Sequence, residues 1–258
     1  MSDVNYRFLV HYVAALSGLA SPIVLDFGCG NGLLVSLLRE AGVECYGADV
    51  FYGGAQFEQL SASGLLTSGV VREIQENGRL PFDDEFFDIV ISNQVFEHVE
   101  RLSQAIDEIH RVLKDDGIAY HHFPSREVVR EGHIGIPLAH RLPPGDLRYS
   151  YTVALRRFGF GSNKGEAPPG VWAREKLDWI DRYCFYRPYA ELSEAFGRHF
   201  TVRHREIDYC RFRARSSAVR FALRIEPLTG IYQRMFRRLA FMAVEMRKKP
   251  SMTARRGS

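Results

Sequence analysis

The stretch "VLDFGCGNG", residues 24–32, joins a short apolar run to a loop with glycine at every second position. The apolar run is typical of a buried parallel strand. Leucines then recur at helical spacing from Leu33 to Ala41, and Gly42 is expected to end that helix. Because glycine lacks a Cβ, the backbone N–H groups of such a loop, together with the helix N-terminus, can approach a ligand closely.

The same alternation of strand and helix continues along the chain. A helix is predicted over 54–63, and an apolar stripe over 102–113 predicts another that ends at Gly117. Strands that alternate with helices at these intervals imply right-handed crossovers and a parallel sheet, with ligands at the carboxyl ends of the strands. The strands predicted in this half of the chain are 23–27, 43–50, 69–75, 87–93 and 118–123.

Beyond residue 124 the regular pattern stops. Residues 125–182 are rich in Gly, Pro, His and Arg and too long for a simple connection, so we expect a lid or a substrate-binding insertion. A helix over 186–200 and two strands, 200–209 and 239–248, are predicted to complete the sheet, with residues 216–238 between these two strands. The predicted fold class is therefore α/β: a doubly wound, mostly parallel, seven-stranded sheet with helices on both faces and an insertion after the fifth strand.

These segments are predicted to form a single domain over 1–258. Its parts are a cofactor-binding half, the insertion, a C-terminal part that completes the sheet, and a disordered tail, at 22–124, 125–182, 183–249 and 250–258.

Composition supports a folded globular protein, with 46% hydrophobic and 25% charged residues. The apolar stretch Phe8–Ala20 is expected to be an opening amphipathic helix rather than a signal peptide, because a strand follows directly. No run approaches the ~18 apolar residues of a membrane-spanning helix. The four cysteines lie far apart without a CxxC pair, which argues against a zinc knuckle or a disulfide framework and favours a reducing, cytoplasmic compartment.

An acidic residue follows the glycine loop at an informative distance. Asp49 ends the second predicted strand, where a carboxylate can accept both hydroxyls of an adenosine ribose. A dinucleotide fingerprint would need its third glycine at position 33, but Leu33 stands there and the glycine is Gly32. The sequence therefore favours an adenosine cofactor other than a nicotinamide dinucleotide.

Taken together, these stretches resemble the class I S-adenosylmethionine-dependent methyltransferases. "LDFGCGNG" is similar to the glycine loop of that family, "GADV" to its ribose-binding strand end, and "LPFDDEFFDIVISNQVFEHV" with "EIHRVLKDDG" to its fourth strand and the helix after it. The resemblance is dense over 22–124 and faint beyond. It implies the methyltransferase fold and S-adenosyl-L-methionine as cofactor.

The resemblance also implies roles for particular residues. Asp26 would lie near the methionine ammonium, Asn93 would border the sulfonium, and Val50 would pack against the adenine. Glu76 stands where the family often has an aspartate that accepts from the adenine amino group, with the backbone of Asn77 as a second contact. The remaining implied cofactor contacts are Gly28 and Gly30 at the methionine portion and Asp49 at the ribose.

The general base is sought among histidines, because a hydroxyl that accepts the methyl group benefits from a base that takes its proton. Candidates are His98, just after the fourth strand, and His133 and His140 in "EGHIGIPLAH". His98 belongs to a Glu97-His98 pair common in the family, for which a structural role is an alternative. His121 and His122 should point to opposite faces of their strand, so at most one reaches a pocket.

No metal is expected, because the spacing of Glu97, His98, His133 and His140 fits no recognised ligand motif. The arginines and aromatic residues of the insertion favour a polar acceptor, sugar-like or anionic, since aromatic faces stack on sugars and arginines bind phosphate or carboxylate. The alternative is an irregular, partly solvated flap. The residues concerned are Arg126, Arg130, Arg141, Arg148, Tyr149, Tyr151 and Trp172.

The C-terminal region is strongly basic from Arg203 onward. An apolar stripe from Leu228 to Leu239, with arginines on the other faces, predicts an amphipathic helix that packs on the sheet or on a second subunit, or binds an anionic membrane surface. Nucleic acid is not expected as a partner, because nothing in the sequence places a basic patch at the catalytic opening.

The sequence thus predicts methyl transfer from S-adenosylmethionine to a hydroxyl of a small molecule or glycan precursor. Two alternatives stay open at this point. One is a catalytically silent protein that binds the cofactor and acts as a partner of another protein. The other is a nicotinamide-dependent oxidoreductase.

Overall fold

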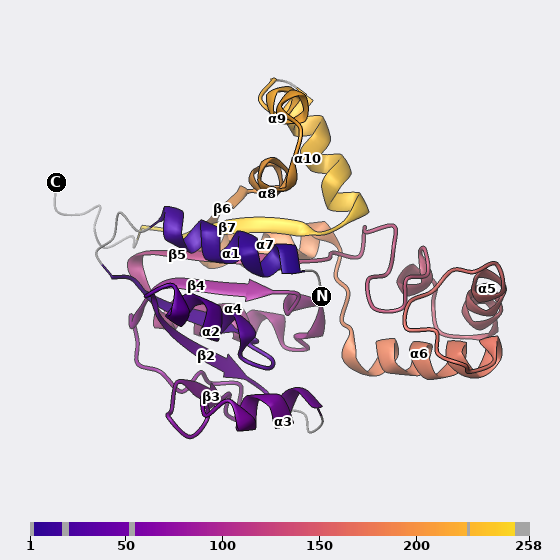
Figure 1. The fold of residues 1–258 in the computed structure, drawn as a ribbon, viewed down its shortest axis with the longest axis horizontal. Helices are drawn as coiled ribbons and strands as arrows, with labels where there is room; N and C mark the ends of the chain where they lie inside the picture. Colours follow the sequence, from indigo (N-terminus) through magenta and orange to yellow (C-terminus); the bar gives the residue numbers. More distant parts are fainter. Residues whose placement is uncertain (1–2, 17–20, 52–54, 226–227, 251–258) are drawn as a thin grey trace.

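A computed structural model of the chain describes residues 3–16, 21–51, 55–225 and 228–250. The predicted tail, 250–258, lies outside these residues except for its first position. Seven strands form one sheet in the order β3-β2-β1-β4-β5-β7-β6 (Figure 1). The strands are β1 (Ile23–Phe27), β2 (Glu44–Asp49), β3 (Val71–Glu73), β4 (Phe87–Asn93), β5 (Leu113–Phe123), β6 (Phe200–His204) and β7 (Met242–Lys248).

The sheet is parallel except at β7, which pairs antiparallel with both β5 and β6. Strand order reverses between β1 and β4, and a reversal of this kind opens the crevice in which doubly wound sheets bind ligands. The predicted doubly wound, mostly parallel sheet of seven strands is confirmed.

Helices cover both faces of the sheet because side chains alternate along each buried strand. Leu25 and Val90 point to the face covered by α4 (Leu102–Val112) and α7 (Tyr189–His199). Val24 and Ile89 point to the opposite face. That face is covered by α1 (Asp3–Ala15), α2 (Leu33–Glu40), α3 (Ala55–Ala62) and α8 (Glu206–Arg213).

Two predicted boundaries are wrong. The helix expected to reach Gly117 ends at Val112, because the chain already pairs with β4 at Leu113 and continues as β5 through the glycine. The strand expected over 200–209 stops at His204, and α8 begins at Glu206. The apparent alternation across these residues is one turn of helix, in which Glu206 is fully buried beside the start of β7.

The insertion is a folded helical unit and not an irregular flap. Its helices are η2 (Ala139–Arg141), α5 (Asp146–Arg157) and α6 (Pro169–Tyr183), which lie to one side of the sheet in Figure 1. Buried Trp172, Leu177 and Ile180 pack with Ile134 and Ile136 into a core separate from those of the sheet. The remaining helices are η1 (Phe96–His98), after β4, and α9 (Ser217–Ala222) and α10 (Leu228–Leu239), between β6 and β7.

Candidate active site

The glycine loop connects β1 to α2 with the left-handed backbone that its sequence predicts. Gly28, Gly30 and Gly32 all have positive φ, at 75°, 55° and 75°. The Gly28 N–H donates to the carbonyl of Ala48 at 2.7 Å, which ties the loop to β2. A Cβ on Gly28 would lie 2.4 Å from Cγ2 of Val95, so only glycine fits there without movement of its neighbour.

Asp49 lies at the carboxyl end of β2 and fastens this loop. Its Oδ2 accepts the Gly30 N–H at 2.6 Å. Burial raises the pKa of Asp49, while hydrogen bonds from the N–H groups of Gly30 and Val50 lower it. Because a carboxylate has further acceptor sites, the contact with Gly30 is compatible with the predicted bond to a ribose.

Asp26 and Asn93 end the neighbouring strands β1 and β4 on the face that α1 covers. The Asp26 carboxyl is buried, and burial together with the negative charge of Asp49 raises its pKa to about 8. Both effects favour the protonated acid, and a cationic ligand would reverse them. The contact of Asp26 with the positively charged end of S-adenosylmethionine stays a prediction.

Helix α1 contributes two polar side chains that the sequence analysis did not identify. Asn5 donates from Nδ2 to Oδ1 of Asn93 at 3.1 Å, and its own Oδ1 accepts the hydroxyl of Tyr209 at 2.5 Å. The Tyr6 hydroxyl also bonds to Asn93, and its pKa is raised by burial and by the charge of Asp26. No local pattern marks Asn5 or Tyr6, because their role arises from the packing of α1 across β4.

The predicted adenine contacts lie near the carboxyl ends of β2 and β3. Val50 is 41% exposed, so its side chain is available for packing against a base. Glu76 and Asn77 are exposed in the turn after β3, where Asn77 Oδ1 accepts the backbone N–H of Arg79 at 2.9 Å. These positions are compatible with the predicted contacts to adenine, which stay predictions.

Two of the three candidate histidines meet. Nε2 of His98, from η1, lies 3.2 Å from Nε2 of His133, from the insertion. His140 does not join the pair: its Nε2 bonds to the carbonyl of Arg126 at 3.1 Å, and its ring packs on Tyr186. Burial lowers the pKa values of His98 and His140, which favours their neutral forms.

A carboxylate holds His133 in place. Oε1 of Glu131 accepts from His133 Nδ1 at 2.7 Å and from the Tyr186 hydroxyl at 2.5 Å, and Oε2 accepts the Ile134 N–H at 2.6 Å. Burial would raise the pKa of Glu131, but these hydrogen bonds and the charge of His133 lower it to about 2. Glu131 and Tyr186 were missed because only the fold brings them to His133.

His121 and His122 point to opposite faces, as predicted, and neither reaches a pocket. Ser92 Oγ bonds to His121 Nδ1 and the Tyr120 hydroxyl to His122 Nε2, each at 2.8 Å. Burial lowers both pKa values to about 3, so the two rings are neutral parts of the core.

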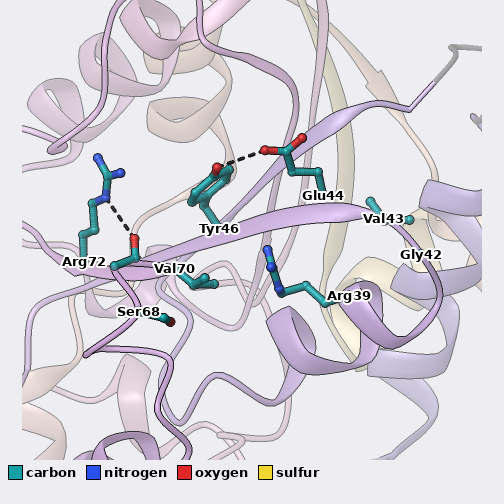
Figure 2. A pocket seen from close by; sticks show the side chains of 9 residues that line it. Arg39, Gly42, Val43, Glu44, Tyr46, Ser68, Val70 and Arg72 are labelled. Atoms are coloured by element: carbon teal, nitrogen blue, oxygen red, sulfur yellow. Dashed lines mark hydrogen bonds between the residues drawn. The ribbon is translucent and has the colours of Figure 1, made fainter.

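Two hollows differ in their distance from the glycine loop. One of about 300 Å³ lies in the insertion and is lined by Arg126, His140, Arg148, Cys184 and Tyr186 among others. A larger one, of about 560 Å³, lies at the amino ends of β2 and β3, away from the glycine loop, and Figure 2 shows its lining. Its arginines are bound to backbone carbonyls, Arg39 to Cys45 and Arg72 to Gly69 and Pro81.

Several side chains expected to contact an acceptor instead hold the insertion together. Trp172 is 2% exposed in the insertion core, and its Nε1 donates to the Asn163 carbonyl at 3.2 Å. Buried Arg148 pairs with Asp181, and Arg141 donates to carbonyls at 126–128. For Trp172 the stacking hypothesis is therefore wrong.

Comparison with known proteins finds a methyltransferase domain in the first half of the chain. Residues 25–121 match the family model described as a methyltransferase domain. A solved S-adenosylmethionine-dependent methyltransferase from Mesorhizobium loti shares the fold, with a TM-score of 0.53, 17% identity, and coverage of 93% of this chain and 98% of that one. Residues 25–121 are thus similar to a methyltransferase domain, and the fold of the chain is that of a solved S-adenosylmethionine-dependent methyltransferase.

Two curated relatives align with less than half of this chain. A ubiquinone biosynthesis O-methyltransferase of Alkalilimnicola ehrlichii is 29% identical over 117 residues, 45% of this chain and 47% of that protein. The human mitochondrial arginine-hydroxylase NDUFAF5 is 30% identical over 97 residues, 38% of this chain and 27% of that protein. The chain thus spans about half, or less, of the length of these relatives.

Proposed function

We propose that the protein transfers the methyl group of S-adenosylmethionine to a hydroxyl oxygen of a small molecule or glycan precursor. The main support for this proposal is the contact between the Nε2 atoms of His98 and His133, on the carboxyl side of β4. It puts proton-accepting groups near a hollow of about 300 Å³, because Tyr186, which lines the hollow, lies 3.1 Å from Nδ1 of His133. Similarity to an O-methyltransferase supports oxygen as the acceptor atom.

When bound, the cofactor supplies an activated methyl group. The chain's own residues then align the acceptor and exclude water from it. Glu131 keeps His133 oriented through Nδ1, which leaves Nε2 to take or polarise the proton of the acceptor hydroxyl. Exposed Arg126 beside the hollow gives a place for a negatively charged or strongly polar substituent of the acceptor.

We expect His133→Ala to lower the rate of methyl transfer about 10²- to 10⁴-fold, because general bases contribute that much to proton transfer. Cofactor affinity should stay near the wild-type value, since His133 lies outside the glycine loop. Transfer of a labelled methyl group to a library of hydroxyl compounds and glycan precursors measures the first quantity, and calorimetric titration the second. His110→Ala, on the surface of α4, is the matched control. Equal rates in both variants would remove His133 from the mechanism.

The alternatives are distinguished by the same titrations. A catalytically silent partner protein would bind S-adenosylmethionine but transfer no label to any acceptor pool. Tight binding of NAD in place of S-adenosylmethionine would instead support an oxidoreductase. The second outcome is disfavoured by Leu33, which stands where a dinucleotide loop has its third glycine.

A cytoplasmic location is part of this proposal. All four cysteines are free, which suits a reducing compartment. Among the described helices, none is both long and apolar enough to cross a bilayer.

A further inference from the structure

The two histidines of the candidate active site face each other through their Nε2 atoms. The Tyr183 carbonyl, which can only accept, binds His98 Nδ1 at 2.6 Å, so that nitrogen carries the proton. Ionised Glu131 likewise requires a proton on Nδ1 of His133. In the neutral rings, both Nε2 atoms therefore present lone pairs to each other across 3.2 Å.

A third donor completes the cluster. Sγ of Cys184, which follows α6, lies 3.9 Å from Nδ1 of both His98 and His133. The three residues each offer one candidate ligand atom, and these atoms all lie within 4.8 Å of one another. The cysteine is unpaired, and burial raises the pKa of its thiol.

A buried carboxyl group lies next to these donors, and burial raises its pKa to about 8. Glu97 is 1% exposed, and both of its side-chain oxygens have no hydrogen-bond partner among the described residues. Its charge acts on Cys184 and on Tyr186, which places it beside the cluster. An unpartnered buried carboxylate is costly, and a nearby cation would offset that cost.

We propose that His98, His133 and Cys184 bind a divalent transition-metal cation of the zinc class. Two nitrogens on a tetrahedral zinc ion lie about 3.3 Å apart, close to the observed separation of the two Nε2 atoms. A nitrogen and a sulfur on such an ion lie about 3.6 Å apart, which is within the 4.8 Å that separates the candidate ligand atoms of the three residues at most. Cys184 releases its thiol proton to solvent as the metal–sulfur bond forms, while each histidine donates a lone pair.

The groups around the three ligands are arranged as they are around known metal sites. The hydrogen bonds from Nδ1 of His98 to a carbonyl and from Nδ1 of His133 to a carboxylate are those that orient metal-ligating histidines. Three protein ligands leave a fourth position open, as in catalytic zinc sites. Cys184 also lines the hollow of about 300 Å³, so the open position faces the region proposed for the acceptor.

The test uses the full-length protein after treatment with a chelator, titrated with Co²⁺. We expect one equivalent to bind and to give the visible bands of a four-coordinate ion with a thiolate-to-cobalt charge-transfer band, both abolished by excess Zn²⁺. Cys184→Ser should remove the charge-transfer band and weaken binding at least tenfold, whereas Cys210→Ser should leave both unchanged. Glu131→Gln, which loosens His133, should weaken binding about 10- to 100-fold.

Absence of one-equivalent binding to the folded wild-type protein would overturn the inference, as would a charge-transfer band that survives in folded Cys184→Ser. Because a bound cation would occupy Nε2 of His133, general-base catalysis by that nitrogen is assayed on the metal-free protein, and the two proposals fail separately. Cation binding without methyl transfer to any acceptor counts against the proposed function alone. Methyl transfer by a protein that binds no cation counts against the metal site alone.

A second inference concerns helices α9 and α10. Helix α10 packs on the body through Phe236, Arg237 and Gln233, the last of which donates to Glu206 at 2.8 Å. Its opposite side is apolar and exposed, with Ile231, Met235 and Leu239 between 50% and 57% accessible. Figure 1 shows α9 and α10 extending away from the sheet.

Exposed cations surround this apolar side. Phe221 and Val219 of α9 are 68% and 50% exposed, and they extend the apolar surface. The exposed arginines on or next to these helices are Arg213, Arg215, Arg220, Arg224, Arg234 and Arg238. The outer surface of α9 and α10 thus combines apolar side chains with guanidinium groups, the composition of helices that lie in the interface of an anionic bilayer.

We infer that the outer surface of α9 and α10 binds an anionic lipid surface. A second copy of the chain is a poorer occupant, because it would place arginines against arginines. Sedimentation with vesicles tests the inference, comparing phosphatidylcholine alone with phosphatidylcholine that contains phosphatidylserine. We expect binding only to the second kind, with a loss of about fivefold for each arginine removed.

Ile231→Ser with Met235→Ser should abolish vesicle binding. Phe158→Ser, which removes an apolar side chain 82% exposed at the end of α5, is the matched control and should bind as wild type does. No preference for anionic vesicles would overturn the inference. A concentration-dependent dimer that Ile231→Ser disrupts would do so in favour of self-association.

Discussion

At the scale of single residues, the cofactor site depends on backbone conformation and on one buried acid. Gly28 has left-handed φ and no room for a Cβ, whereas Gly42, with φ of 82°, has nothing within 4 Å of that position. A substitution at Gly42 would therefore cause backbone strain alone, whereas one at Gly28 would cause backbone strain and a steric clash. Asp26 affects the pH dependence of cofactor binding, because its protonation state is expected to change when the ligand binds.

Gly28→Ala should be clearly more destabilising than Gly42→Ala. Both substitutions put alanine in a left-handed conformation, which costs about 1–2 kcal/mol. Gly28→Ala adds the clash with Val95 and displaces the loop, so cofactor affinity should fall as well. Urea denaturation measures the free energy of unfolding, and Gly28→Ala with Val95→Ala should recover part of the loss. Equal destabilisation in the two single variants would contradict the steric argument.

Cofactor binding should release a proton from Asp26. Its pKa of about 8 in the free protein leaves it protonated at pH 7, and the cationic ligand favours the carboxylate. Affinity should therefore rise by up to roughly tenfold per pH unit between pH 6 and 8 and level off above pH 8. Calorimetry in two buffers of different ionisation enthalpy counts the released proton. Asp26→Asn should bind more weakly and show no such pH dependence.

The same pKa affects the stability of the free protein. Because folding raises the pKa of Asp26 from 3.8 to about 8, its contribution is fully present below pH 3.8 and is lost as pH rises through 8. Thermal unfolding of the cofactor-free protein should show this loss. Asp26→Asn, which cannot ionise, should have the shallower profile between pH 5 and 8.

At the scale of elements, the sequence predicted the first half of the chain better than the second. In 22–124 each strand or helix has its own periodicity and glycine boundaries, so β1, α2 and β4 were found within a few residues. The insertion was predicted, but its helices were missed because they bury few positions, among them Trp172 and Leu177, and leave no sustained stripe. The α1 contacts and the donor cluster with Cys184 arise from tertiary packing, which local patterns do not carry.

Trp172→Ala should unfold the insertion while the cofactor-binding half stays folded. Removing a fully buried tryptophan costs about 3–5 kcal/mol, and the insertion has its own small core to lose. We expect methyl transfer to be lost and S-adenosylmethionine binding to be retained, with new protease cleavage confined to 125–182. Trp179→Ala, at a residue that is 38% exposed on the same helix, is the control for stability. Loss of cofactor binding in Trp172→Ala would show that the two parts fold as one.

At the scale of the whole molecule, distant parts of the chain meet over the cofactor site. Tyr209 of α8 bonds to Asn5 of α1, and Asn5 bonds to Asn93 of β4, so residues more than 200 positions apart share one network. The pKa of Tyr6 shows that Asp26 lies within reach of the same helix. Helix α1 thus covers the site that the glycine loop opens.

Tyr209→Phe should weaken cofactor binding although Tyr209 lies outside the glycine loop. The lost bond leaves a buried amide oxygen less satisfied, which costs about 1–3 kcal/mol of stability. It also loosens Asn5 and, through it, Asn93. Tyr46→Phe, which removes a bond to Glu44 at the far edge of the sheet, should stay within 0.5 kcal/mol of wild type. Calorimetric titration and urea denaturation of both variants compare them directly, and matched results would show that the network does not reach the cofactor.

The place of β7 in the sheet has a consequence for biosynthesis. β7 follows β6 in the chain yet lies between β5 and β6, bonded to both. As the chain leaves the ribosome, β5 therefore keeps an unpaired edge, and β6 has no neighbour, until residues 242–248 emerge. An open edge of this kind invites pairing with other chains, so the nascent protein is most exposed to aggregation, and most in need of a chaperone, late in its synthesis.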